Sequence, residues 1–153
     1  MMKRSLSSIL GVTLLEIMLV LAIAAMIIVM SIRYYQSANA SSQANALMQQ
    51  IQAITAAADN IAQGAGGVYS TISTTTLMPL LPGGSTAFTT PWGQSIAITG
   101  APSSYNVTVP QIPPGVCAIV LPRLKSNNQF TSFSASCNPT APATIGYTYD
   151  ATM

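Results

Sequence analysis

The sequence contains no histidine and very little charge. Only 5% of its 153 residues are Asp, Glu, Lys or Arg, whereas a soluble domain has about 25%. The absence of histidine removes the commonest general base and the commonest metal ligand. Two cysteines cannot form a closed zinc site on their own. We therefore expect no enzyme activity, no metal site and no cofactor.

The few charges are nearly balanced. Lys3 and Arg4 lie at the start of the chain, and the other charged residues carry equal numbers of positive and negative charges: Arg33, Arg123 and Lys125 against Glu16, Asp59 and Asp150. No basic stripe exists, so phosphate-mediated binding of nucleic acid is not expected. Outside the apolar run the chain is rich in Ser, Thr, Ala, Asn and Gln instead, and this composition is typical of a surface that packs against copies of itself or faces the cell exterior.

One long apolar run is present near the N-terminus. Residues 12–32 are almost all apolar, and at 1.5 Å per residue they span about the 30 Å of a bilayer core. Lys3 and Arg4 precede the run, so the positive-inside rule places the N-terminus in the cytoplasm and the rest of the chain outside. The alternative is a secretory signal peptide, for which Ala38-Asn39-Ala40 offers an A-x-A-like cleavage pattern. Against it, the run is longer than the usual apolar region of a signal peptide, and the pattern lies about eight residues past its end.

Glu16 is the one carboxylate inside this run. A charge at membrane depth costs a few kcal/mol even on the more lenient insertion scales. A tolerated position near the interface, in the first helical turn, is one interpretation. The other is that Glu16 is kept for a positive partner. Cleavage after Gly11 would create such a partner, because Val12 would gain a free α-amine one turn away.

The stretch "GVTLLEIMLVLAIAAMI", residues 11–27, resembles the class III signal of type IV pilins and pseudopilins. The resemblance implies a leader, residues 1–11, that prepilin peptidase removes on the cytoplasmic face. It identifies Gly11 as the last leader residue, Val12 as the new N-methylated terminus and Glu16 as the docking glutamate. It directly covers about the first 35 residues.

Two departures refine the resemblance. Val12 stands where type IVa pilins commonly have Phe, and the Pro and Gly residues of the type IVa stalk are missing. Both departures favour a type IVb-like pilin.

The apolar run continues into an amphipathic segment. No Gly or Pro occurs from Val12 to Ala62, which predicts one helix about 75 Å long. In residues 34–63 the apolar positions recur every three or four residues, at Leu47, Ile51, Ile54, Ala58 and Ile61. This stripe predicts packing against a sheet. A coiled coil is the weaker alternative, because complementary charges flanking the stripe are missing and the repeat covers little more than two heptads.

The remaining residues are predicted to form a small head. Residues 64–93, rich in Gly, Pro and Thr, read as a connector loop that begins with the helix stop at Gly64. Residues 94–153 then contain segments with strand-like alternation: 95–99, 104–109, 115–122, 129–137 and 144–149. We predict an α+β fold with a long N-terminal helix, transmembrane in its first half and packed by its second half on a small antiparallel sheet. The resemblance to pilins implies the same head.

Trp92 and the cysteines have two interpretations each. Trp92 is either a ligand-binding aromatic or, following the burial habits of Trp, a residue that pins the connector to the sheet. Cys117 and Cys137 both lie in the part predicted outside the cytoplasm, where a disulfide is allowed; two buried thiols are the alternative. A C-terminal disulfide loop resembles the exposed D-region of pilins, which major pseudopilins usually lack.

These patterns favour a structural subunit, or prepilin, of an extracellular type IV pilus of the type IVb-like kind. Such a subunit would reside in the inner membrane before assembly and self-associate into a helical filament. Its other partners would be prepilin peptidase and the pilus assembly machinery. The close alternative is a pseudopilin of a type II secretion system, which would act in the periplasm; major pseudopilins usually bind calcium, and this chain has few carboxylates for it. An anchored Ser-Lys enzyme using Lys125 and a plain anchored binding module are the remaining alternatives.

Overall fold

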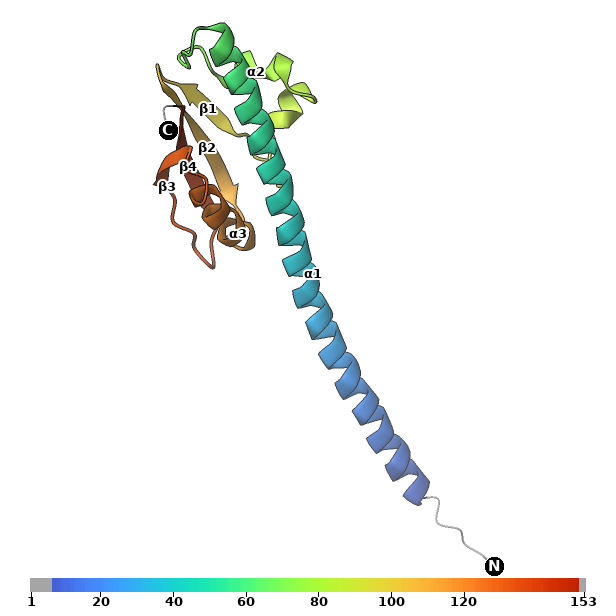
Figure 1. Ribbon diagram of the computed structural model, residues 1–153. Coiled ribbons are helices and arrows are strands. Elements are labelled where there is room, and N and C mark those ends of the chain that lie inside the picture. Colours follow the sequence, from blue (N-terminus) through green and yellow to red (C-terminus); the bar gives the residue numbers. More distant parts are fainter. Residues whose placement is uncertain (1–6, 152–153) are drawn as a thin grey trace, which may run out of the picture. The chain divides into compact units, whose positions relative to one another are not determined.

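The computed structural model describes residues 7–151, with side chains from residue 13 onward. Part of the predicted leader, including Lys3 and Arg4, lies outside these residues. The chain forms two compact units, one that ends at Ala38 and one that begins at Asn39. Helix α1 (Ser7–Gly64), the blue-to-green ribbon of Figure 1, has residues in both units.

Helix α1 ends where the sequence predicts. The amide of Gly67 donates to the carbonyl of Ala62 at 2.7 Å, and Gly66 and Gly67 have φ angles of 72° and 87°. This left-handed backbone closes the last turn, and glycine adopts it without the penalty that a Cβ brings.

The predicted stripe on the second half of α1 is buried. Leu47, Ile51, Ile54 and Ala58 are at most 1% exposed, and Ile61 packs partly buried against the same core. Their spacing of three and four residues places them on one helical face, which explains why they are covered together.

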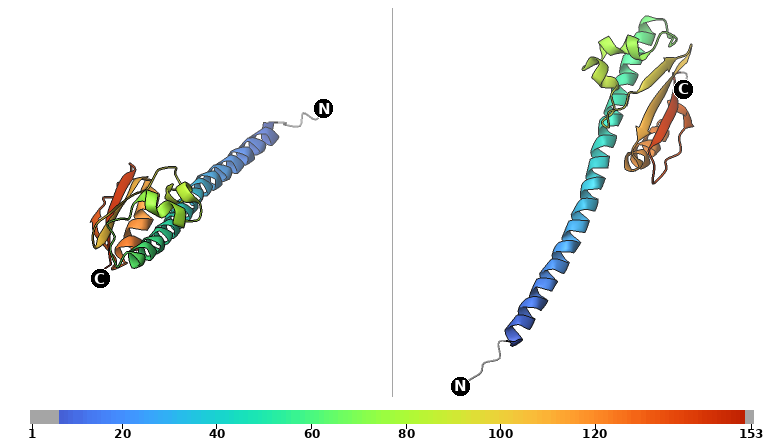
Figure 2. Two further views of the ribbon diagram at one scale, coloured as in Figure 1. Left: turned by 90° about the horizontal axis from the view of Figure 1, so that it is seen from above. Right: turned by 180° about the vertical axis from the view of Figure 1, so that it is seen from behind.

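The core on which this face packs includes one side of a four-stranded antiparallel sheet. Its strands are β1 (Ala97–Gly100), β2 (Ser104–Ile112), β3 (Phe130–Ser134) and β4 (Ala143–Asp150), in the order β1-β2-β4-β3. Figures 1 and 2 show the second half of α1 alongside this sheet. The predicted α+β class and the packing of the helix on the sheet are therefore confirmed.

Burial alternates along the strands. In β2, Tyr105, Val107 and Val109 are buried, whereas Asn106 and Thr108 are exposed. Successive side chains of a strand point to opposite faces, so one face of the sheet covers the core and the other meets solvent.

The prediction of a strand over residues 115–122 is wrong. These residues lie in helix α3 (Pro114–Lys125). A short apolar run does not distinguish a buried strand from a buried helix by periodicity. Two signals favour the helix: Pro114 occupies the first helical turn, where its missing N–H costs nothing, and Arg123 and Lys125 lie in the last turn, where cations are favoured.

The burial of α3 has the helical period. Val116, Cys117, Val120 and Leu124 are each at most 1% exposed, while Ala118 between them is exposed. A strand would have buried alternate residues instead. Helix α3 connects β2 to β3 and belongs to the same core as α1 and the sheet.

The connector contains three short helices: α2 (Thr74–Leu77), η1 (Met78–Leu80) and η2 (Gly84–Phe88). Ser73 caps α2, since its hydroxyl accepts from the amide of Thr76. The connector also approaches the first hairpin closely. A Cβ at Gly100 would meet the carbonyl oxygens of Tyr69 and Ile72, so glycine is required there.

Trp92 has the structural role predicted for it. Its indole Nε1 donates to the carbonyl of Pro110 in β2 at 3.1 Å, and its ring packs partly buried against the core. Trp92 therefore fastens the end of the connector to the sheet.

Candidate assembly and processing site

The predicted processing site lies within the first unit. Gly11 and Val12 have helical backbone in α1, and their side chains are outside the description. Prepilin processing and N-methylation at this bond remain predictions.

Glu16 is exposed on α1 among apolar neighbours. A groove on the helix surface runs past its carboxylate and is lined by Thr13, Glu16, Ile17, Val20 and Leu21. In the part of the first unit that has described side chains, the nearest cation along the sequence is Arg33. It lies roughly 25 Å away along the helix axis at 1.5 Å per residue. An intrahelical ion pair between these two residues is therefore excluded.

The helix around Glu16 is apolar on every side. Large hydrophobic side chains from Leu14 to Ile32 are between 52% and 71% exposed. One helix of the described residues is long and apolar enough to cross a membrane, and its apolar window is not buried against the rest of the chain. A helix that is apolar all round is stable when lipid or other apolar helices surround it, so this segment indicates membrane anchoring or export.

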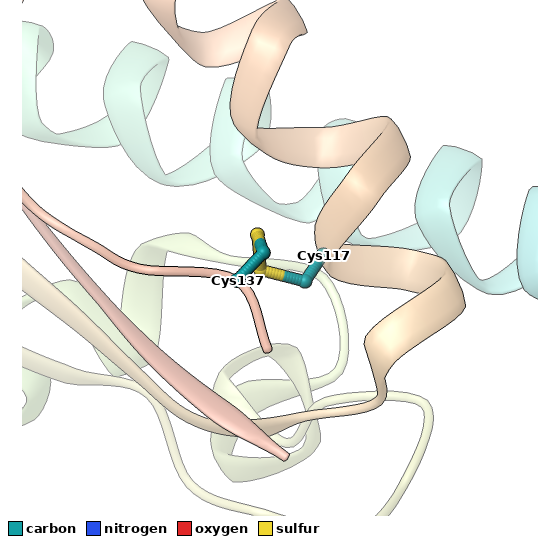
Figure 3. The surroundings of a disulfide bond; sticks show 2 residues. All are labelled: Cys117 and Cys137. Atoms are coloured by element: carbon teal, nitrogen blue, oxygen red, sulfur yellow. A yellow bond between two sulfur atoms is a disulfide. The ribbon is translucent and has the colours of Figure 1, made fainter. Parts of the chain in front are cut away.

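The second unit contains a disulfide between Cys117 and Cys137. The bond joins the buried face of α3 to the segment after β3 (Figure 3), with the two Cα atoms 5.7 Å apart. This distance is usual for a disulfide. Disulfides persist in oxidising compartments, so the bond indicates an extracytoplasmic location for this unit. The alternative of two buried thiols is wrong.

A tyrosine cluster around Asp59 was not predicted. The hydroxyl of Tyr69 donates to Oδ1 of Asp59 at 2.9 Å, and the hydroxyl of Tyr149 donates to Oδ2 at 3.2 Å. A third tyrosine, Tyr105, donates to Thr55 Oγ1 at 3.2 Å. Its ring stacks on that of Tyr149, with centroids 4.8 Å apart. The cluster joins α1 to the connector, to β2 and to β4.

The environment of these tyrosines disfavours the phenolate. Burial, together with the hydrogen bond and the charge of Asp59, raises the pKa of Tyr69 to about 12. Burial and the same carboxylate raise the pKa of Tyr149 to about 12. Burial also raises the pKa of Tyr105 and of Tyr147. These hydroxyls therefore stay protonated, and those of Tyr69, Tyr105 and Tyr149 serve as hydrogen-bond donors.

Lys125, the candidate for a Ser-Lys enzyme, and the neighbouring Arg123 both have structural contacts. The Arg123 guanidinium donates to Asn45 Oδ1 at 2.7 Å. The Lys125 ammonium lies 6.0 Å from the ring centroid of Phe133, a distance at which cations are attracted to aromatic faces. Among the described residues, no group of three or more His, Cys, Asp or Glu side chains is placed to hold a metal ion.

No family model matches the sequence, and neither the curated proteins nor the solved structures give a match. The architecture is nevertheless pilin-like. It combines a long N-terminal apolar helix, a small four-stranded antiparallel sheet packed on the helix, and a disulfide.

Proposed function

We propose that this chain is a prepilin, a structural subunit of an extracellular type IV pilus of type IVb-like character. The observation that carries the proposal is the exposed Glu16 on a helix segment that is apolar on every side. The pilin-like head that follows supports it. A simple membrane anchor would have no use for a carboxylate at this depth, which is costly unless it is paired.

The proposed pathway starts in the inner membrane. Prepilin peptidase hydrolyses the Gly11–Val12 peptide bond on the cytoplasmic face, which releases the leader with its new carboxylate and leaves the α-amine of Val12. N-methylation of this amine retains its positive charge. The subunit is then held in the membrane by its apolar helix and is available to the assembly machinery.

Docking uses the pair of charges that cleavage creates. Glu16 of an incoming subunit pairs with the Val12 amine of the subunit already at the filament base. Both charges become buried among apolar helices, where an unpaired charge is heavily penalised. The pairing therefore fixes the register of one helix against the next.

The heads would then cover the outside of the filament. The second unit has two acidic and two basic side chains in its sequence, namely Asp59, Asp150, Arg123 and Lys125. Their formal charges cancel, so neighbouring heads do not repel one another strongly at close packing.

The alternative is a pseudopilin of a type II secretion system. The disulfide favours the pilus, since a C-terminal disulfide loop resembles the D-region of pilins. Deletion of the chain separates the two: loss of surface filaments supports a pilus subunit, whereas loss of protein secretion alone supports a pseudopilin.

The decisive experiment combines mass spectrometry with electron microscopy. Protein from native cells should begin at an N-methylated Val12, and Glu16→Ala should abolish filaments while the protein still reaches the membrane. Ser31→Ala is the matched control, because Ser31 lies in the same apolar helix and its hydroxyl bonds internally to Ile27. Material that begins at Met1 or at Ser41, or abundant filaments from Glu16→Ala, would contradict the proposal.

A further inference from the structure

The apolar surface of α1 ends abruptly at three consecutive residues. Ile32 is the last large aliphatic residue of the run, and Arg33, Tyr34 and Tyr35 follow it. The two tyrosines are 79% and 71% exposed. Successive helical residues point about 100° apart, so these three side chains surround more than half of the helix at one level.

One polar residue near the end of this apolar surface, Ser31, does not interrupt it. Ser31 is polar, but its hydroxyl donates to the carbonyl of Ile27 at 2.8 Å. A hydroxyl bonded within its own helix is compatible with a lipid environment. Apart from Glu16, residues 13–32 thus form a 20-residue surface acceptable to lipid, about 30 Å long, and Arg33 is the first charged residue after Glu16.

We infer that Arg33, Tyr34 and Tyr35 form an interfacial girdle that binds the outer leaflet of the membrane, with phospholipid headgroup phosphates as the partner of Arg33. The inference rests on the membrane-anchored state in the proposed function and adds the depth at which the helix is held. Tyr is enriched at membrane interfaces because its ring is apolar and its hydroxyl is polar.

Side-chain direction supports this position. Helical side chains lean toward the N-terminus, so the rings of Tyr34 and Tyr35 lie over the turn that precedes them, at the edge of the hydrocarbon. The guanidinium of Arg33 is able to bind phosphate through several parallel hydrogen bonds. Arg33 is positively charged, and Tyr34 and Tyr35 have exposed phenols. These groups complement the negative, hydrated headgroup layer that lies at the end of the apolar surface.

A second copy of this chain is the other possible partner of Arg33, through its Glu16. The lipid is favoured because one carboxylate would satisfy Arg33 alone, whereas a headgroup layer at this level also accommodates both phenols. The two partners differ in their dependence on protein concentration, because a lipid contact persists in an isolated subunit.

The test measures depth in vesicles of phosphatidylcholine and phosphatidylglycerol. Both cysteines of the chain are joined in the disulfide, so Met30→Cys provides a single thiol for a nitroxide label on the full chain. Oxygen and nickel-chelate accessibility then give the depth of the label. Replacing Tyr34 and Tyr35 by Ala should move the label deeper by roughly 3 Å, the rise of two residues, and adding Arg33→Gln should increase the shift.

Two controls accompany this measurement. Ile27→Ala with Ile28→Ala removes similar bulk from the middle of the span and should leave the depth unchanged. Tyr34→Trp with Tyr35→Trp should retain the original depth, since Trp shares the interfacial preference of Tyr.

An unchanged label depth in the triple variant would overturn the inference. A depth that shifts only at high protein-to-lipid ratio would also overturn it, in favour of contact with a second copy. Neither result would bear on the pilus role, because the vesicles contain no assembly machinery and no filaments are required.

Discussion

The hydroxyl of Tyr69 donates a 2.9 Å hydrogen bond to the carboxylate of Asp59. It links the connector to α1, and the bond from Tyr149 to the other oxygen of the same carboxylate links β4 to α1. One acidic side chain therefore joins three parts of the second unit that are far apart in sequence. The stability of this unit should depend on Asp59 more than on any other exposed or half-exposed polar residue of α1.

Replacing Asp59 by Ala should destabilise the second unit by about 1–3 kcal/mol, because hydrogen bonds to a charged group are lost and two phenols lose their acceptor. Denaturant unfolding monitored by circular dichroism measures the change. Asn60→Ala is the control, since Asn60 is the exposed neighbour on the same helix and its replacement should change stability by less than about 0.5 kcal/mol. Equal effects of the two variants would refute a special role for Asp59.

Alkaline pH should weaken the tyrosine cluster. An unfolded tyrosine has a pKa of about 10, whereas Tyr69 and Tyr149 have pKa values raised to about 12 in the folded chain. Above pH 10 the unfolded state therefore binds fewer protons than the folded state. The contribution of these groups to stability is complete below pH 10 and is lost as the pH rises through about 12.

Denaturant unfolding at a series of pH values between 9 and 12 measures this loss. Tyr69→Phe lacks one of the shifted groups, so its stability should fall less steeply over the same range. If the stability of the variant and of the parent chain fell equally with pH, the raised pKa of Tyr69 would not be the cause of the loss.

Removal of the disulfide should cost roughly 3 kcal/mol for a loop of this size in the chain-entropy model. The bond joins residues separated by 20 positions in sequence. Paired Cys117→Ala and Cys137→Ala substitutions, compared with the oxidised parent by thermal denaturation, should show a lower midpoint. A reducing agent should lower the midpoint of the parent and leave that of the double variant unchanged, which separates loss of the bond from loss of packing.

Gly100→Ala should destabilise the junction between the connector and the β1–β2 hairpin by about 1–3 kcal/mol or prevent folding, because backbone atoms occupy the place of the new methyl group. Gly64→Ala is the matched control: a Cβ there meets nothing within 4 Å, and alanine is the better helix former. The control should be neutral or slightly stabilising. Comparable losses in both variants would show that the close approach at Gly100 is not the cause.

The helical part of the fold was predictable because its patterns are long. No Gly or Pro occurs from Val12 to Ala62, which predicts one long helix. The apolar stripe that includes Leu47 and Ile51 predicts a buried helical face. Both predictions are confirmed. Strand alternation likewise predicted the regions of all four strands. The strand predicted over residues 115–122 is wrong because the six apolar residues 116–121 fit both periods. The signal that separates the two is Pro114, which favours a helix start.

The Asp59 cluster could not be predicted, because its members come from α1, the connector, β2 and β4. Nothing in a linear pattern states that Tyr69 and Tyr149 approach the same carboxylate. A usable signal exists nonetheless: Asp59 is one of only two carboxylates after residue 16, and it lies in the part of α1 that packs on the sheet. The roles of Gly11, Val12 and Glu16, by contrast, are implied by the resemblance to the class III signal of type IV pilins, and they await the experiments above.

The first half of α1 has a consequence for how a subunit can move. Because its apolar surface surrounds the helix completely, no rotation or one-sided contact shields it from water. If the proposed function holds, the helix of a subunit that leaves the bilayer replaces its contacts with lipid acyl chains by contacts with the helices of neighbouring subunits. This exchange takes place without exposure of the apolar helix to water. Filament growth would then be confined to a base embedded in the membrane, and detached heads in solution could not add to a growing tip.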